Sequence, residues 1–363
     1  MTKISDTKPE LNPLQAFLAI KENKKKIYGT GELKFDDDIV STGSVLFDEL
    51  LGGGFKVGSS RFTGPMESGK TSQGLVWGKN WQDTIENSKV VYFNCEGRMR
   101  KNILDRTGID QSIEKFQIVD TNNSNMIYKT CEWCMELDPE NKRYFFIIDS
   151  YDSMINELDL TKSYDEAQKI GGQAVINAMA NKKLGLPTSI CGHHLYGISQ
   201  VRVQMKKAGH MMNTFDGASG GNALNHGSSV IGKFASPIQG NNIYETYGDT
   251  KSKVVGRHIK IYMQKTYNET TGQSVTIPIK FGHKGGVWRE REAVDLALGH
   301  DFYSGPGAWK MASPVFIEGM KEKNVEIPEK IQGIGAMTAL FDSRPDIVDA
   351  TIEIHKEVTC NAP

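Results

Sequence analysis

The residues best suited to chemistry form one short stretch, Gly64-Pro65-Met66-Glu67-Ser68-Gly69-Lys70-Thr71. It fits the phosphate-binding pattern G-x-x-x-x-G-K-[ST] at every defined position. In this pattern the glycines let the backbone curl, so that N–H groups face phosphate oxygens and the next helix adds its positive dipole end. Lys70 would reach the β- and γ-phosphates, and the Thr71 hydroxyl would ligate Mg²⁺. The stretch predicts a nucleoside triphosphate site; the alternative is a chance match in a glycine-rich turn.

The flanking residues predict the elements that would hold this loop. A strand-compatible segment, 61–63, precedes it, and a helix-compatible run, 72–81, follows. Further buried-strand signatures follow along the chain, alternating with helical segments: strands at 90–94, 118–119, 144–148 and 188–192, helices at 101–106, 124–138 and 166–184. This alternation predicts a largely parallel sheet covered on both faces. Three later strands are predicted at 229–234, 257–263 and 275–281, the last two as an antiparallel extension.

Three polar residues stand where predicted strands end, and ligands of open α/β sheets bind at those carboxyl ends. Asp149 follows four large apolar residues and can hold Mg²⁺ through water. Glu96 can orient and deprotonate a water that attacks the γ-phosphate. His194, at the end of the strand predicted over 188–192, can sense that phosphate. The alternatives are a helix-capping aspartate, a solvated loop glutamate and a structural histidine, the last being the commoner role for such a residue.

The composition describes an ordinary globular protein. The chain has 363 residues, 38% of them apolar and 24% charged, and no apolar run of membrane-spanning length. The N-terminus lacks the apolar core of a secretory signal. Five cysteines without framework spacing favour a reducing cytoplasm, and Cys131 and Cys134 fit a half-buried helix better than a zinc site. A net charge of −1 leaves nucleic-acid binding to local patches.

Three outlying segments complete the predicted organisation. Residues 12–28 read as one amphipathic helix. Residues 199–221 form a polar segment too long for an ordinary connector, and it carries Arg202, Lys206 and Lys207, which fit either DNA contact or a solvated surface. From about Glu290 the pattern is helical again. We therefore predict three parts: a segment over 1–34 whose helix packs on its own domain or on a neighbouring subunit, a core with the phosphate-binding loop over 35–288, and a small module over 289–363.

Several separate stretches together resemble one known family. They are Ser41-Thr42-Gly43-Ser44 with Asp48, Leu50 and Gly52, then Gly64–Thr71, Gly220–Leu224, Ala293–Leu298 and Gly307-Ala308-Trp309. In order and spacing they resemble the RecA strand-exchange recombinases, over roughly residues 12 to 356. The pair His193-His194, where that family usually has Asn-Gln, is nearer to the phage UvsX recombinases.

The resemblance implies a fold and an activity. The fold is α/β: a RecA-type P-loop NTPase core with a mixed, mainly parallel sheet, an N-terminal helical arm and a small C-terminal α/β module. The activity is that of a DNA-dependent ATPase that uses ATP and Mg²⁺, forms helical filaments on single-stranded DNA and pairs it with a homologous duplex in recombination and repair. The implied partners are single- and double-stranded DNA, further copies of the chain, and mediator and single-strand-binding proteins. The implied location is the cytoplasm of a bacterium or of a phage-infected host.

Carried over by position, the resemblance also assigns roles. Gly64 to Ser72 hold the triphosphate, with Lys70 as a catalytic cation, and Thr71 and Asp149 serve the metal. Glu96 activates water, and His194 takes the place of the family's γ-phosphate-sensing glutamine.

The DNA contacts and the subunit boundary follow in the same way. Residues 157–165 correspond to the first DNA loop, and residues 199–221 to the second. Gly220, Gly221 and Asn222 resemble the end of the second loop. Lys265 would reach the ATP of the next protomer.

Some positions depart from the family's pattern. The adenine-stacking tyrosine falls at Ile103, one interface lysine falls at Met263, and a DNA-binding basic residue falls near Val175. Two rivals share the same loop. A hexameric helicase or motor would form closed rings, and a non-enzymatic regulator would bind ATP without turnover.

Overall fold

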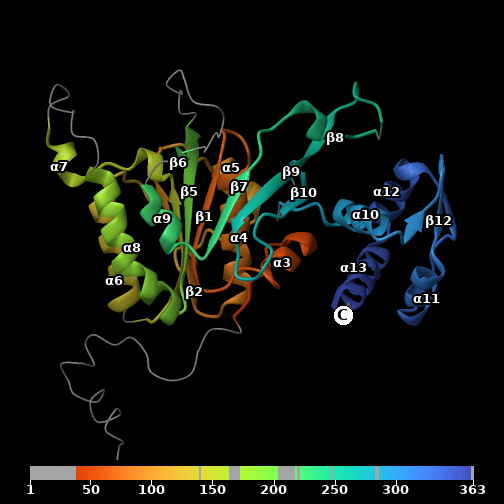
Figure 1. Cartoon of the computed structure of the whole chain (residues 1–363), viewed down its shortest axis with the longest axis horizontal. Coiled ribbons are helices and arrows are strands. Elements are labelled where there is room, and N and C mark those ends of the chain that lie inside the picture. The colour runs from red at the N-terminus through yellow and green to blue at the C-terminus, as the bar shows by residue number, and fades with distance from the viewer. Residues whose placement is uncertain are drawn as a thin grey trace, which may run out of the picture.

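The computed structural model describes residues 38–138, 140–162, 172–202, 217–218, 221–246, 248–282 and 286–360. These residues build a large mixed sheet with helices on both faces and a smaller helical part beside it (Figure 1). No helix in these ranges is long and apolar enough to cross a membrane.

The main sheet has ten strands within the described ranges, in the order β10-β9-β7-β1-β5-β4-β2-β3, with β6 added to β5 and β8 to β9. The six strands from β7 to β3 in this order are parallel, while β9 and β10 run antiparallel at one edge. The predicted fold class, an α/β protein with a mixed and mainly parallel sheet, is confirmed. The strands are β1 (Gly58–Gly64), β2 (Ser88–Asn94), β3 (Phe116–Val119), β4 (Arg143–Asp149), β5 (His194–Arg202), β6 (Gly217–Ala218), β7 (Val230–Phe234), β8 (Asn242–Tyr244), β9 (Val254–Lys265) and β10 (Ser274–Lys280).

The central strands are buried on both faces, and alternate residues enter two different cores. Val90 and Tyr92 of β2 join the cluster that includes Phe47, Trp77 and Trp81. Val91 and Phe93 of the same strand join a second cluster under α6, α8 and α9. This period of two explains why these strands read as continuous apolar runs. The helices of the core are α3 (Val45–Leu51), α4 (Lys70–Thr84), α5 (Lys101–Thr107), α6 (Ser124–Glu136), α7 (Glu157–Leu160), α8 (Gly172–Ile190) and α9 (Gly221–Gly227).

The C-terminal part has a core of its own, in which Phe302, Phe316 and Phe341 are buried. Its elements are α10 (Arg289–Gly299), β11 (Tyr303–Ser304), β12 (Trp309–Ala312), α11 (Pro314–Glu322), β13 (Lys330–Gln332), α12 (Gly333–Ser343) and α13 (Pro345–Cys360). Glu292 of α10 joins it to the larger part by accepting hydrogen bonds from the Ser44 hydroxyl and from the first backbone N–H groups of α3. A carboxylate at a helix N-terminus satisfies otherwise unpaired donors. The predicted boundary at residue 289 stays a prediction, and the predicted arm over residues 1–34 lies outside the described residues.

One predicted element is wrong. Residues 188–190 are the last turn of α8, and the strand begins only at His194. Pro187 lies inside this helix, where a proline usually marks a helix end. The Thr188 hydroxyl donates to the Leu184 carbonyl one turn earlier, so the buried hydroxyl has a hydrogen-bond partner within the helix. The other strand predictions are confirmed, and so is the half-buried helix that carries Cys131 and Cys134.

Candidate nucleotide-binding site

The strand register brings the polar residues at the carboxyl ends of the strands together at one end of the sheet. Gly64, which opens the phosphate loop, lies opposite Gln200 of β5, and Asn94 lies opposite Asp149 of β4. All four strands are parallel, so their carboxyl ends meet where α4 begins. Segments separated by more than a hundred residues therefore form one site.

The phosphate loop joins β1 to α4 in the predicted way. Gly69 caps the helix with a φ of 99°, in the left-handed region that favours glycine. The Lys70 ammonium donates to the loop's own carbonyls, at 2.8 Å from Gly64 O and 2.6 Å from Pro65 O. Burial lowers the pKa of Lys70, while Asp149, Glu96 and Asp152 act in the opposite direction. The ammonium is thus held on the loop beside carboxylates, and a triphosphate would supply it with oxygen partners.

Asp149 and Thr71 form the part of the site that fits a metal ion. The Thr71 hydroxyl donates to Asp149 Oδ2 at 2.6 Å, and the Tyr92 hydroxyl donates to the same oxygen at 2.7 Å. Burial raises the pKa of Asp149, and the two hydroxyl donors act to lower it. In the described ranges no group of three or more His, Cys, Asp or Glu could hold a metal. This donor set suits Mg²⁺ that takes its other ligands from phosphate and water.

Glu96 lies two residues beyond β2 and is held by groups from three directions. Its Oε1 accepts from the Ser150 hydroxyl at 2.6 Å and from Gln200 Nε2 at 3.0 Å. Arg98 lies 3.1 Å from Oε2. The Glu96 side chain is only 11% exposed. A fixed carboxylate at this edge can accept a proton from a water molecule placed above the phosphate loop.

His194 does not lie at this site, contrary to the prediction. It is the first residue of β5 and pairs with Gly58, so six residues of extended strand, roughly 20 Å, separate it from Gln200. Its ring is buried and stacked on Phe145, with Nε2 2.8 Å from Ser60 Oγ and Nδ1 2.7 Å from the Lys56 carbonyl. Burial lowers the pKa of His194 to about 4. It is a neutral structural histidine, the alternative that the sequence also offered.

The residue missed by the sequence analysis is Gln200, which occupies the carboxyl end of β5. Its backbone N–H donates to Asp152 Oδ2 at 2.6 Å, and its amide reaches Glu96. The signal was the run Leu195-Tyr196-Gly197-Ile198, a buried strand that would have moved the polar end to Ser199 and Gln200. The predicted second DNA loop is corrected with it, because residues 199–202 belong to β5.

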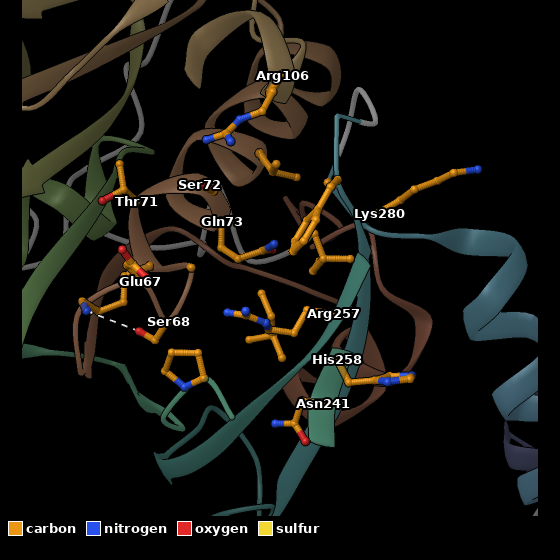
Figure 2. A pocket seen from close by; sticks show the side chains of 18 of the residues that line it. Glu67, Ser68, Thr71, Ser72, Gln73, Arg106, Asn241, Arg257, His258 and Lys280 are labelled. Atoms are coloured by element: carbon orange, nitrogen blue, oxygen red, sulfur yellow. Dashed lines mark hydrogen bonds between the residues drawn. The ribbon is translucent and has the colours of Figure 1, made fainter. Parts of the chain in front are cut away.

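A pocket of about 600 Å³ extends from the phosphate loop (Figure 2). Residues 67–72 form one side, α5 contributes Ile103 and Arg106, and β9 contributes Arg257 to Lys260. Phe281, just beyond β10, also lines it. The volume lies in the range of small-molecule and cofactor sites. The pocket thus combines a phosphate-binding end with apolar walls that suit the faces of a nucleobase.

The remaining predicted residues are distributed as follows. Lys265 ends β9, lies opposite Ile231 and donates to the Ser228 carbonyl at 2.6 Å. It is therefore near the amino ends of the parallel strands, away from this chain's own phosphate loop. Arg202 ends β5, and Gly221 and Asn222 begin α9. Lys206, Lys207 and Gly220 lie outside the described residues, and all DNA-binding roles stay predictions.

Comparison with known proteins gives one consistent result. The chain is 26% identical to the RecA protein of Bordetella avium over 337 residues, which cover 86% of the chain and 88% of that protein. It is 26% identical to RecA of Malacoplasma penetrans over 301 residues, 80% of the chain and 84% of that protein. The match to RecA of Leptospira biflexa is 25% over 275 residues and spans 65% of that protein's length. No family model matches the chain. The chain is similar to RecA proteins over most of its length.

Proposed function

We propose that this chain is a member of the RecA family: a DNA-dependent ATPase that assembles on single-stranded DNA and pairs it with a homologous duplex. The observation that carries the proposal is the hydrogen bond from Gln200 to Glu96. One partner stands where a base for ATP hydrolysis is needed. The other lies in the strand that leads directly into residues 203–220, the proposed DNA-binding segment.

In the proposed reaction, this chain's residues bind ATP and prepare the attacking water. The loop N–H groups and Lys70 bind the phosphates, and Thr71 and Asp149 hold Mg²⁺, which neutralises charge on the phosphate oxygens when bound. Glu96 orients the water and accepts its proton. Ser150, Gln200 and Arg98 fix the carboxylate, so little reorganisation is needed at the moment of reaction.

Gln200 provides the proposed link between nucleotide and DNA. Its amide bonds Glu96, its backbone pairs with Gly64 at the start of the phosphate loop, and it lies two positions before the end of β5. A γ-phosphate that draws the amide away from Glu96 would free the base and shift the following segment. Arg202, Lys206, Lys207 and residues 220–222 would then grip the DNA backbone, with strong salt dependence and no sequence preference.

Assembly into a filament is proposed from an exposed apolar surface on α6 and α8. Side chains of both helices contribute, and these two helices pack against each other. Its residues are Met126 and Trp133 of α6, Leu137 directly after it, and Val175, Met179 and Leu186 of α8, all more than half exposed. A surface of this kind favours a protein partner. The amphipathic segment 12–28 of a neighbouring copy is the proposed occupant, and Lys265 of that neighbour would approach the ATP.

The narrower relationship to phage UvsX recombinases was argued from the pair His193-His194. This pair lies at the amino end of β5, whereas Gln200 lies near its carboxyl end, so the pair does not replace a residue of the site. The proposal is therefore made for the RecA family as a whole, with mediator and single-strand-binding proteins as further proposed partners.

Two measurements test the proposed function. ATP turnover should rise severalfold or more when single-stranded DNA is added, and electron microscopy with Mg²⁺ and a slowly hydrolysed ATP analogue should show extended helical filaments. Closed rings that unwind duplex DNA would replace the proposal with a helicase or motor. ATP binding without turnover, with or without DNA, would favour the non-enzymatic regulator.

A further inference from the structure

Gln73, in the first turn of α4, carries a carboxamide that no described residue of the chain pairs. The residue is 1% exposed, and its Oε1 is buried without a hydrogen bond. Among the described residues, its Nε2 also makes no hydrogen bond. Nearly all buried amides in folded proteins are paired, so an unpaired one beside a pocket is available to hydrogen-bond a ligand there.

The side chain is buried in the wall of the pocket beside the phosphate loop. Figure 2 shows it projecting from α4 into the space between Arg106 and Arg257. Val76 lies one turn further along the same helix, and Ile103 lines the same cavity from α5. A Cβ added at Gly286 would lie 3.7 Å from Gln73 Nε2 and 2.7 Å from a Val76 methyl, so the chain closes closely around this point.

Four cations that line the pocket are poorly suited to reading a neutral base edge, and its second carboxamide, Asn241, is only partly buried. Arg106, Arg257, Lys260 and Lys280 are cations and match phosphate oxygens better than an uncharged ring. A carboxamide offers both a donor and an acceptor, and its terminal torsion is soft enough to present either one. Gln73 therefore places one donor and one acceptor next to the apolar side chains Val76 and Ile103 of the pocket.

We propose that Gln73 determines base specificity by reading the edge of adenine. Its carbonyl would accept from the 6-amino group and its amide N–H would donate to N7, a two-bond pairing that glutamine makes with adenine. Guanine presents two acceptors at the same edge, so the carbonyl of Gln73 would face O6 without a donor. The inference rests on the proposed function, because it takes the pocket as the site of ATP.

The experiment is competition binding against a ribose-labelled fluorescent ADP. The competitors are ATP, GTP and purine riboside triphosphate, which lacks only the 6-amino group. The natural chain should bind ATP about tenfold more tightly than the analogue lacking the amino group, since one hydrogen bond to a buried group is lost. In Gln73→Met, which keeps the volume and removes the amide, all three should bind within about twofold of one another.

Gln82→Met is the matched control. It makes the same change on the same helix, but the Gln82 amide bonds the backbone carbonyls of Asp110 and Lys115 outside the pocket. It should lower stability and leave the preference for ATP unchanged. Gln73→Leu is the second variant in case Gln73→Met does not fold.

The outcomes distinguish a failure of base reading by Gln73 from a failure of the proposed function. Equal binding of ATP and the amino-free analogue by the natural chain overturns base reading by Gln73 and leaves the proposed function in place. A preference for ATP over the amino-free analogue that persists in Gln73→Met or Gln73→Leu also overturns base reading by Gln73. If the natural chain binds no triphosphate, both the inference and the proposed function fail.

Discussion

His194 is the residue whose role differs most between sequence and structure, and its replacement by glutamine distinguishes the two. A phosphate sensor would control turnover and contribute little to folding. A buried core histidine would control stability in a pH-dependent way. The structure predicts the second outcome, because His194 Nδ1 must donate to the Lys56 carbonyl and Nε2 then accepts from Ser60.

The magnitude follows from the depressed pKa. Burial lowers the pKa of His194 from the ordinary 6.5 to about 4 in the folded chain, so the unfolded chain binds more protons between these values. Stability is therefore fully present above the unfolded pKa and is lost as the pH falls from about 6.5 toward about 4. Linkage gives a loss of about 2 kcal/mol from His194 between about pH 7 and about pH 5. His193, whose pKa burial also lowers to about 4, adds a similar loss.

Urea unfolding at the two pH values, followed by tryptophan fluorescence, measures this loss; the Trp81 ring lies 6.2 Å from that of His194. His194→Gln should reduce the pH-dependent loss by about 2 kcal/mol, while His193 keeps its share. His226→Gln, at an exposed position of α9, is the control for replacing a histidine by glutamine, and it should leave the pH-dependent loss unchanged. ATP turnover of folded His194→Gln should stay within about threefold of the natural chain. An unchanged pH-dependent loss together with a hundredfold or so fall in turnover would refute the structural role.

Four further substitutions address the proposed site and the fold. Gln200→Ala should leave ATP affinity within about threefold and reduce stimulation of turnover by DNA at least about tenfold, as measured by phosphate release with and without single-stranded DNA; full stimulation would remove Gln200 from the link. Glu96→Gln should bind ATP and DNA while turnover falls about a hundredfold, and unchanged turnover would exclude Glu96 as the base. Lys70→Ala should lose ATP binding and strand exchange, so normal exchange would contradict the phosphate-binding role. Gly74→Ala should lower the unfolding free energy by about 1–3 kcal/mol, because the new Cβ would lie 2.4 Å from the Tyr196 ring; equal urea midpoints would show that the strand yields.

Patterns within a short stretch predicted where the phosphate-loop residues, Glu96 and Asp149 lie relative to the strands; their roles stay predictions. Whereas the phosphate loop follows the mostly polar β1 and has a sequence pattern of its own, Glu96 and Asp149 each follow a strand whose apolar run is unbroken, 90–93 and 144–148. Such strands alternate between the two cores of the sheet, so both faces require apolar residues. The pocket beyond the loop could not be predicted in this way, because it joins α4, α5 and β9, which only the folded sheet brings together.

The error at His194 shows which information was missing. Two polar residues interrupt the chain between α8 and the apolar run of β5, and a buried pair of histidines looks from sequence like the polar end of a strand. The parallel pairing of β5 with β1 decides which end of β5 lies beside the phosphate loop. Gly58 lies beside His194 and Gly64 beside Gln200, so the strand that carries the phosphate loop fixes which end of β5 can meet a phosphate. A residue's chemistry suggested a sensor, but only its register against β1 could show whether that chemistry lies at the nucleotide or a whole strand length away.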